Sequence, residues 1–235
     1  VTVLSQNHAN MNDADNITTC GNCGKGEENS GDLKACTACK LVKYCNRECQ
    51  IAHRSLHKKA CKKRAAELHD KALFKEHPPQ ECPICFLPMS DDTSHNTFNT
   101  CCGKRICNGC TYAMVEEAES RGKVQLCAFC REPDSYFITD DEEIQRINKL
   151  IKNDIADGYH ALAGAYITGN LGLPQDRKKG NELMLRAGEL GCAESYFNLG
   201  IYYLLGKGGE VDKKKAKHFF ELAAINGGVH ARNNL

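Results

Sequence analysis

The sequence lacks several features that would assign it to a common class of protein. No apolar run approaches the roughly 18 residues that a membrane-spanning helix needs, so we expect no membrane span. Basic and acidic residues nearly cancel, and the net charge of +1 excludes the broad basic surface of a specific nucleic-acid binder. The local exception is a basic run that we interpret as a solvated helix face, Lys58, Lys59, Lys62, Lys63 and Arg64.

Cysteine is almost absent from the second half of the chain. Of the 16 cysteines, only Cys192 lies beyond Cys130. Metal chemistry is therefore confined to the first part, and we interpret Cys192 as a small buried apolar residue. No secretory signal is recognisable before the cysteines, which favours reduced thiols, and a cytoplasmic or nuclear location, over a disulfide framework.

The first cysteine cluster has the paired spacing that zinc chelation needs. Between residues 20 and 61 the chain reads C-x2-C, C-x2-C, C-x3-C and H-x3-C. Zinc prefers four thiolate or imidazole ligands, and two ligands this close in sequence can bind one ion from a single turn. The segment has few large apolar side chains, so we expect metal, worth about 10–16 kcal/mol of apparent binding energy, to replace the missing core. The candidate ligands are Cys20, Cys23, Cys36, Cys39, Cys45, Cys49, His57 and Cys61.

This cluster resembles the MYND zinc finger, including the run from Tyr44 to Gln50 and the closing segment from His57 to Cys61. The resemblance implies a module that binds proteins, often through short proline-containing peptides. It places His57 at the ligand position and leaves His53 as a solvated helix residue, although His53 is an alternative ligand. The resemblance also implies interleaved pairing, with Cys20, Cys23, Cys45 and Cys49 on one ion and Cys36, Cys39, His57 and Cys61 on the other.

The second cluster contains three C-x2-C pairs and a cysteine doublet, again enough for two zinc ions. Its candidate ligands are Cys82, Cys85, Cys101, Cys102, Cys107, Cys110, Cys127 and Cys130. Residues 82 to 131 resemble a RING finger, which implies that the first and third pairs share an ion. Lys104 stands where the family has His, and protonated Lys cannot ligate. We expect the doublet, bent at Gly103, to supply both missing ligands; His95 with one of the two cysteines, or an incomplete site, are alternatives.

The RING resemblance implies a ubiquitin ligase that docks a ubiquitin-conjugating enzyme. Arg131 matches the cation that bridges the enzyme and its ubiquitin, but Ala128 stands where Pro is common. A non-enzymatic scaffold that binds peptide motifs is therefore the alternative, whereas a zinc enzyme is disfavoured because catalytic zinc needs an open coordination position. The implied docking residues are Ile84, Met114, Val115 and Leu126.

The last part of the chain is internally repeated. Leu162-Ala163-x-x-Tyr166-x-x-Gly169 recurs as Leu199-Gly200-x-x-Tyr203-x-x-Gly206, 37 residues later. Such a period predicts an α-solenoid. We expect small residues to permit close helix contacts and Tyr166 and Tyr203 to fill the space between helices. The pattern resembles the Sel-type helical repeats, relatives of tetratricopeptide repeats, which implies a scaffold for protein partners. The small residues are Ala163, Gly164, Gly200 and Ala223.

We therefore predict a mainly α fold with small zinc-stabilised α+β modules: two cross-brace zinc fingers followed by a short α-solenoid. The predicted function is a zinc-binding protein-interaction adaptor with ubiquitin ligase activity. A helix over 111–122 belongs to the second finger, and a capping box from Thr139 to Glu142 opens the repeats. The predicted segments are a disordered leader (1–19), a MYND-type finger (20–61), a helical linker ended by Pro78-Pro79 (62–79), a RING-like finger (80–132) and helical repeats (138–235).

Overall fold

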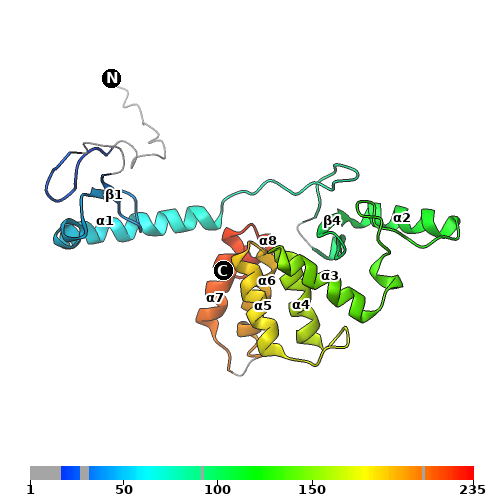
Figure 1. Ribbon diagram of the computed structural model, residues 1–235. Helices are drawn as coiled ribbons and strands as arrows, with labels where there is room; N and C mark the ends of the chain where they lie inside the picture. Colours follow the sequence, from blue (N-terminus) through cyan, green and yellow to red (C-terminus); the bar gives the residue numbers. More distant parts are fainter. Residues whose placement is uncertain (1–16, 27–31, 91–92, 208–209) are drawn as a thin grey trace, which may run out of the picture. The chain divides into compact units, whose positions relative to one another are not determined.

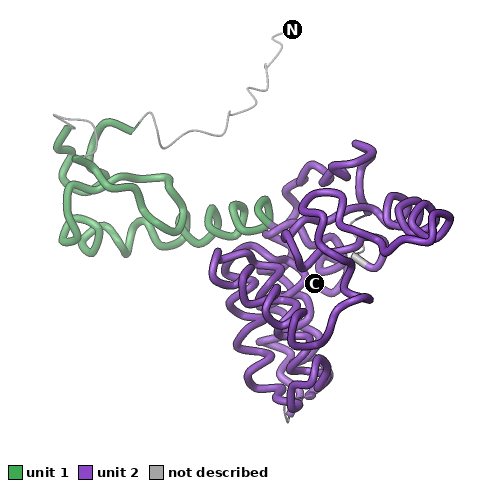
Figure 2. Tube along the Cα trace, turned by 45° about the vertical axis from the view of Figure 1, so that its right-hand side comes forward, with its two compact units in different colours: residues 1–72 green, residues 73–235 purple. Residues whose placement is uncertain are grey.

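A computed structural model describes residues 17–26, 32–90, 93–207 and 210–235. The chain forms two compact units, residues 1–72 and 73–235 (Figure 2). The fold is mainly helical, as predicted (Figure 1). Most of the predicted disordered leader lies outside the described residues. Across the residues described, no helix is both long enough and apolar enough to cross a membrane.

The first unit is a small antiparallel hairpin followed by a long helix. Strand β1 (Lys34–Ala35) pairs with β2 (Lys43–Tyr44). Helix α1 (Arg47–Leu73) is continuous, so the predicted linker helix is not separate from the finger. Asn46 caps its start by accepting a hydrogen bond from the Cys49 N–H at 2.8 Å. The spacing of His57 and Cys61 is itself helical, which lets the helix run on through the last ligand.

The second finger contains a hairpin and one helix. Strand β3 (Asn96–Asn99) follows a single turn η1 (Thr93–His95) and pairs antiparallel with β4 (Lys104–Cys107). The turn between the strands holds the cysteine doublet, and Gly103 has a φ of +74°, which favours glycine. Helix α2 (Asn108–Ser120) begins three residues earlier than predicted because Cys107 serves as its N-cap. A second single turn, η2 (Ser135–Phe137), leads to the repeats.

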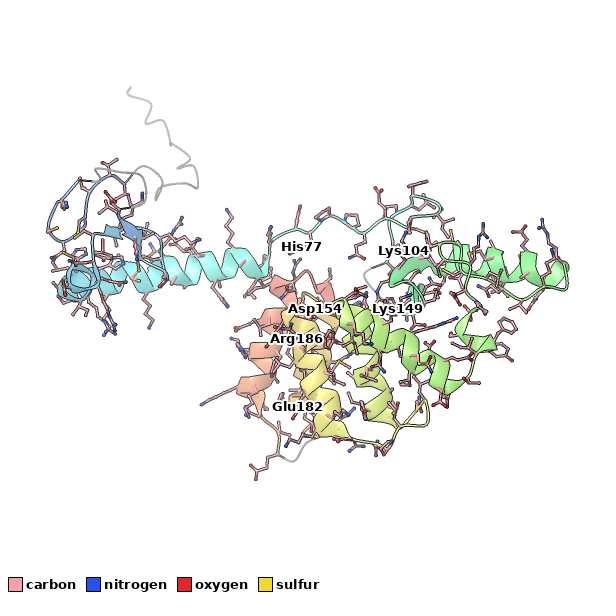
Figure 3. The ribbon with its side chains drawn as sticks, in the orientation of Figure 1. His77, Lys104, Lys149, Asp154, Glu182 and Arg186 are labelled. Carbon is pink, nitrogen blue, oxygen red and sulfur yellow. The ribbon has the colours of Figure 1, made fainter. Side chains whose placement is uncertain are left out.

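The repeats are built from consecutive helices, each packed against the next. Thr139 and Glu142 form the predicted capping box of the first helix. The helices are α3 (Asp140–Lys152), α4 (Ala156–Thr168), α5 (Arg177–Glu189), α6 (Ala193–Leu204), α7 (Lys213–Ile225) and the short α8 (Val229–Arg232). Asp154, after α3, forms an ion pair with Arg186 of α5 at 3.4 Å (Figure 3).

Equivalent positions of the two repeats make the same bonds. In the first, the Tyr166 carbonyl accepts from the Asp176 N–H at 2.8 Å. The Asp176 side chain then caps α5 by accepting from the Lys179 N–H at 2.9 Å. Tyr203 and Asp212 repeat both roles, with Asp212 capping α7. The recurring Tyr, near the end of its helix, and the recurring Asp, at the cap of the next helix, therefore set the turn between paired helices. Tyr203 also packs against the core, stacked on Phe219 with ring centroids 5.4 Å apart, as expected.

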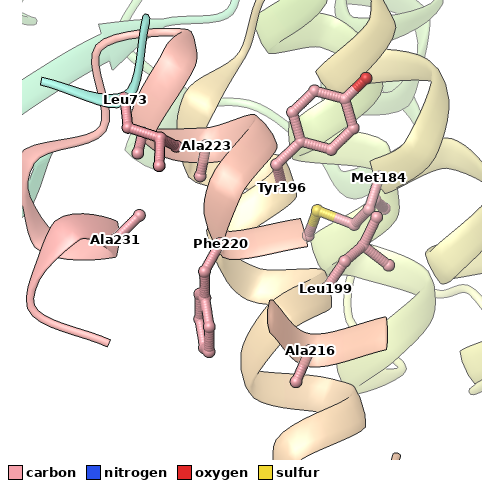
Figure 4. Packing of buried hydrophobic residues seen from close by; sticks show 10 residues of the cluster. Leu73, Met184, Tyr196, Leu199, Ala216, Phe220, Ala223 and Ala231 are labelled. Carbon is pink, nitrogen blue, oxygen red and sulfur yellow. The ribbon is translucent and has the colours of Figure 1, made fainter. Parts of the chain in front are cut away.

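The core of the repeats depends on two aromatic residues that the sequence analysis missed. Tyr196 and Phe220 are buried among small and aliphatic side chains (Figure 4). The expectation that Tyr166 fills this space was wrong, since its ring is only half-buried and lies beneath the Lys179 ammonium, 4.1 Å from the ring centre. Gly164 also makes no close contact, because a Cβ built there would meet nothing within 4 Å.

The hairpin of the second finger is attached to α3 and α4. The Thr100 hydroxyl donates to Glu143 at 2.9 Å. A Cβ on Gly103 would come within 3.2 Å of Leu150, so the turn packs closely on α3. Arg105 forms a two-pronged ion pair with Asp157, at 2.7 and 3.2 Å, in which both side chains are largely buried. Because water screens a buried pair only weakly, this contact fixes the position of the finger on the repeats.

The close packing at Gly200 yields a first prediction. A Cβ there would lie 2.5 Å from the Phe220 ring, so Gly200→Val should destabilise the repeats by about 1–3 kcal/mol through overpacking. Urea unfolding followed by circular dichroism measures this loss, and zinc content should stay unchanged. Gly164→Val is the matched control and should be nearly neutral. Equal stability of the two variants would contradict the contact.

Candidate metal centres

Four sets of ligand-type side chains converge in the described part of the chain. Within each set, all ligand atoms lie within 4.8 Å of one another. The sets are Cys20, Cys23, Cys45, Cys49 (site 1); Cys36, Cys39, His57, Cys61 (site 2); Cys82, Cys85, Cys107, Cys110 (site 3); and Cys101, Cys102, Cys127, Cys130 (site 4). Every metal ligand named from the sequence lies in one of them, and the pairs interleave in both fingers.

The distances between sulfurs fit a tetrahedral metal. Four sulfurs at the usual 2.3 Å zinc–sulfur bond lie about 3.8 Å apart. The observed separations are 3.7 Å between Cys23 and Cys45, 3.8 Å between Cys85 and Cys107, and 3.7 Å between Cys102 and Cys127. A disulfide would need about 2.05 Å, and all the described cysteines are free thiols. The donor sets are thus those of closed zinc sites.

Four of the five C-x2-C pairs share one backbone turn, which we call a knuckle; the fifth, Cys107 and Cys110, lies at the start of α2. In each knuckle, the residue after the second cysteine donates its N–H to the carbonyl of the first cysteine, at 2.8–3.0 Å. That residue always has a left-handed backbone, with φ between +57° and +72°. Only the first knuckle places glycine there, although left-handed backbone costs other residues about 1–2 kcal/mol. The four residues are Gly24, Lys40, Phe86 and Arg131.

The knuckles also prepare their first thiol for metal binding. Burial opposes ionisation of these thiols, but backbone N–H groups of the same turn donate to the sulfur and outweigh it. The pKa of Cys20, Cys36 and Cys82 falls to about 6, and that of Cys127 to about 7. The lowered pKa means that the first cysteine of each knuckle readily forms the thiolate that binds metal.

His53 is not the solvated residue that we expected. Its Nδ1 lies 3.1 Å from the Tyr44 hydroxyl, and its ring stacks on that of His57 with centroids 5.8 Å apart. Nε2 of His57 faces Cys39 at 3.1 Å, so this nitrogen belongs to site 2. His53 thus braces the ring of a ligand without being one. The helical spacing of the two His could have predicted their contact.

Site 4 uses the cysteine doublet on the turn between β3 and β4. His95, the alternative ligand, is exposed and lies outside the set. Lys104 turns its ammonium to the ring of Phe129, 4.2 Å from the ring centre (Figure 3). This cation–π contact, which the sequence did not reveal, gives the Lys104 ammonium a partner other than a metal ion.

The residues expected to dock a partner differ in exposure. Ile84 and Leu126 are 37% and 42% exposed. Met114 packs beside the core of the finger, whereas Val115 lines a separate cavity. Arg131 is exposed, with its backbone fixed by the knuckle.

Comparison with known families assigns two parts of the chain. Residues 20–61 match the MYND finger, and residues 156–192 and 193–228 match the Sel1 repeat. Residues 82–131 lie outside both matches. Since the MYND finger is a zinc-binding domain, zinc is the cofactor of this protein. The MYND finger and the Sel1 repeats indicate protein–protein interaction.

Several solved structures are similar to the repeats. The Sel1 repeat protein from Oxalobacter formigenes is 25% identical, with a TM-score of 0.36 over 39% of this chain and 37% of that one. A protective antigen of uropathogenic Escherichia coli with an SLR fold is 25% identical, with a TM-score of 0.35 over 40% of this chain and 20% of that one. Helicobacter pylori cysteine-rich protein B is 20% identical, with a TM-score of 0.40 over 55% of this chain and 93% of that one. The chain thus spans well under half the length of the first two.

We propose that each of the four sets holds one zinc ion, and a metal count tests this directly. Native mass spectrometry of the full chain should show four bound ions. Cys102→Ser should remove one of them, because an incomplete tetrahedron loses most of its binding energy. Cys192→Ser, which alters the cysteine outside the sets, should keep all four. Only two ions in the parent protein would overturn the assignment of sites 3 and 4.

The knuckle geometry gives a separate prediction at Gly24. A Cβ there meets nothing within 4 Å, but φ is +72°. Gly24→Val should therefore weaken site 1 by at least about 1–2 kcal/mol through backbone strain alone. Zinc release to a competing chelator measures the effect. Gly26→Val, two residues on and without positive φ, should change zinc retention little, and the same loss in both variants would contradict the strain argument.

Proposed function

We propose that the second finger acts as a RING-type ubiquitin ligase and that the MYND finger and the repeats select its targets. The observation that carries this proposal is the interleaved pairing of sites 3 and 4 beneath exposed aliphatic side chains. Such a finger contributes no nucleophile. Its rate effect comes from positioning the loaded enzyme so that a substrate Lys can attack.

The knuckle at site 3 supports docking. Ile84, Phe86 and Leu87 all lie on it, and the last two are 72% and 64% exposed. The corresponding residues of the first knuckle are Asn22, Gly24 and Lys25. Three large apolar side chains at one exposed tip do not contribute to metal binding, so a partner is the simplest reason for them. A ubiquitin-conjugating enzyme is the partner that we propose.

Besides docking the conjugating enzyme, the finger would have to restrain the bound ubiquitin, and Arg131 suits this role. It follows the last ligand pair directly, and the bond from its N–H to the Cys127 carbonyl, 3.0 Å, fixes its backbone. A guanidinium carries five donors in a planar fork, which can bridge two protein surfaces at once. The MYND finger would in addition bind proline-containing peptides of targets. Thiolate sites persist in reducing compartments, which supports the cytoplasm or nucleus as the location.

Two substitutions separate docking from transfer. Ile84→Ala should weaken binding of the conjugating enzyme, because it removes ground-state contact. Arg131→Ala should leave docking nearly intact and slow transfer about tenfold or more, because the Arg acts in the reactive arrangement. Binding is measured by titration, and transfer by single-turnover discharge of the enzyme-linked ubiquitin onto free lysine.

Val124→Ala is the matched control for Ile84→Ala, since Val124 is also exposed, at 49%, but belongs to no docking position. All variants should retain four zinc ions. Absence of discharge or chain formation with every conjugating enzyme of a broad panel would favour the non-enzymatic scaffold. Lys104 in place of a ligand His and Ala128 in place of Pro are the residues that favour that alternative.

A further inference from the structure

A groove on the second finger includes none of the exposed knuckle residues Ile84, Phe86 and Leu87, although Val115 and the site 4 ligand Cys101 line it. It is a cavity of about 350 Å³ between β3, α2, η2 and α3. Its lining comes from all four elements and includes Thr97–Thr100, Val115, Glu119, Asp134, Tyr136 and Arg146.

One wall of the groove is the edge of a strand. Three consecutive residues of β3, Thr97 to Asn99, line it, and Thr100 and Cys101 of the following turn continue the run. Since neighbouring side chains of a strand point to opposite faces, an unbroken run can line a groove only along the backbone edge. Among the described strands, β3 pairs with β4 alone. Such an edge leaves N–H and C=O groups directed outward, ready to pair with an extended peptide.

The opposite rim presents two aromatic rings in a fixed arrangement. Tyr136 and Phe137 are 87% and 50% exposed. Their rings stand edge to face at 86°, with centroids 5.4 Å apart. The Asp134 carboxylate caps the turn that carries them, accepting from the Tyr136 N–H at 3.1 Å. Aromatic faces held in this way attract both apolar side chains and cations.

The charge of the groove selects the kind of peptide. Glu119 and Asp134 both line it, and neither forms an ion pair among the described residues. The one cation in the wall, Arg146, is already engaged by the Pro133 carbonyl at 2.9 Å and by Glu132 at 3.4 Å. The four acidic residues Asp140 to Glu143 begin α3 directly beyond the aromatic turn. This local excess of negative charge favours a basic ligand.

We propose that this groove binds an extended peptide segment of a partner protein that carries a Lys or Arg side chain. The peptide adds a strand to β3. Its basic side chain lies between Glu119 and Asp134, against the face of an aromatic ring. The proposed docking tip at Ile84, Phe86 and Leu87 contributes no residue to the groove, and Val115 is the one docking position that lines it.

The test uses the full chain with zinc bound. A degenerate library of seven-residue peptides is passed over the immobilised protein, and the peptides that it retains are sequenced. This retained pool should be enriched in Lys and Arg and depleted of Asp and Glu. A Lys peptide chosen from the pool should bind at least about tenfold more tightly than the same peptide with Glu in place of Lys. A pool with no preference for basic residues overturns the proposal.

Two matched variants locate the binding. Glu119→Lys should lower the affinity for the Lys peptide about tenfold. Glu116→Lys makes the same charge change on α2 outside the groove and should change this affinity less than about twofold. Tyr136→Ala should also weaken binding while zinc content stays unchanged. Equal losses in the two charge variants would show general attraction to an acidic finger and would overturn the site. N-methylation of alternate peptide amides should abolish binding if the peptide pairs with β3; unchanged binding contradicts that geometry.

Discussion

Tetrahedral chelation by interleaved pairs is the constraint on which both fingers depend. Their buried clusters are small: Leu33 and Tyr44 with three ligand cysteines in the first finger, and Met89 and Ile106 with Cys82 in the second. So few apolar side chains cannot offset the conformational entropy of the chain. Because each ion joins pairs that are distant in sequence, it closes long loops that no local contact could hold. Once the ligand pairs are held together, strands of two to four residues are enough to complete each finger.

Sequence spacing predicted the features that depend on local chemistry. The ligand pairs, the 37-residue repeat and the capping box at Thr139 could all be read directly, since each is a short pattern with one physical meaning. Features set by packing between distant residues could not. Phe220 fills the space at Gly200 because packing brings together residues of two different helices, which no repeat spacing pairs. The contact of His53 with His57, by contrast, follows from their helical spacing and was overlooked. The continuity of α1 was missed for a different reason: a domain boundary was assumed where the ligands end, although helical spacing crosses that point.

The proposed tasks of the second finger lie on its two open surfaces, and the doublet turn attaches it to the repeats; Thr100 and Cys101 of that turn also line the groove. The knuckle tip at Ile84 is free, the groove along β3 is open, and the turn that carries the doublet is packed on the repeats. This arrangement explains why Gly103 is needed: it bends the doublet around the ion and also lets α3 approach to within contact of the same turn. A side chain at that position would disturb a metal site and a packing contact together. Partner binding at the Ile84 tip need not disturb either.

The buried pair between Arg105 and Asp157 has a consequence for proteolysis. Together with the bond from Thr100 to Glu143, it attaches the hairpin to α3 and α4 through side chains, independently of the connecting chain. A protease that cleaves the exposed turn at Tyr136 would therefore cut the polypeptide without releasing the finger. The two fragments should migrate together under native conditions. They should separate only when zinc is removed and the turn that carries the cysteine doublet loses its shape. The two fragments of the cleaved protein would thus stay associated for as long as zinc remains bound.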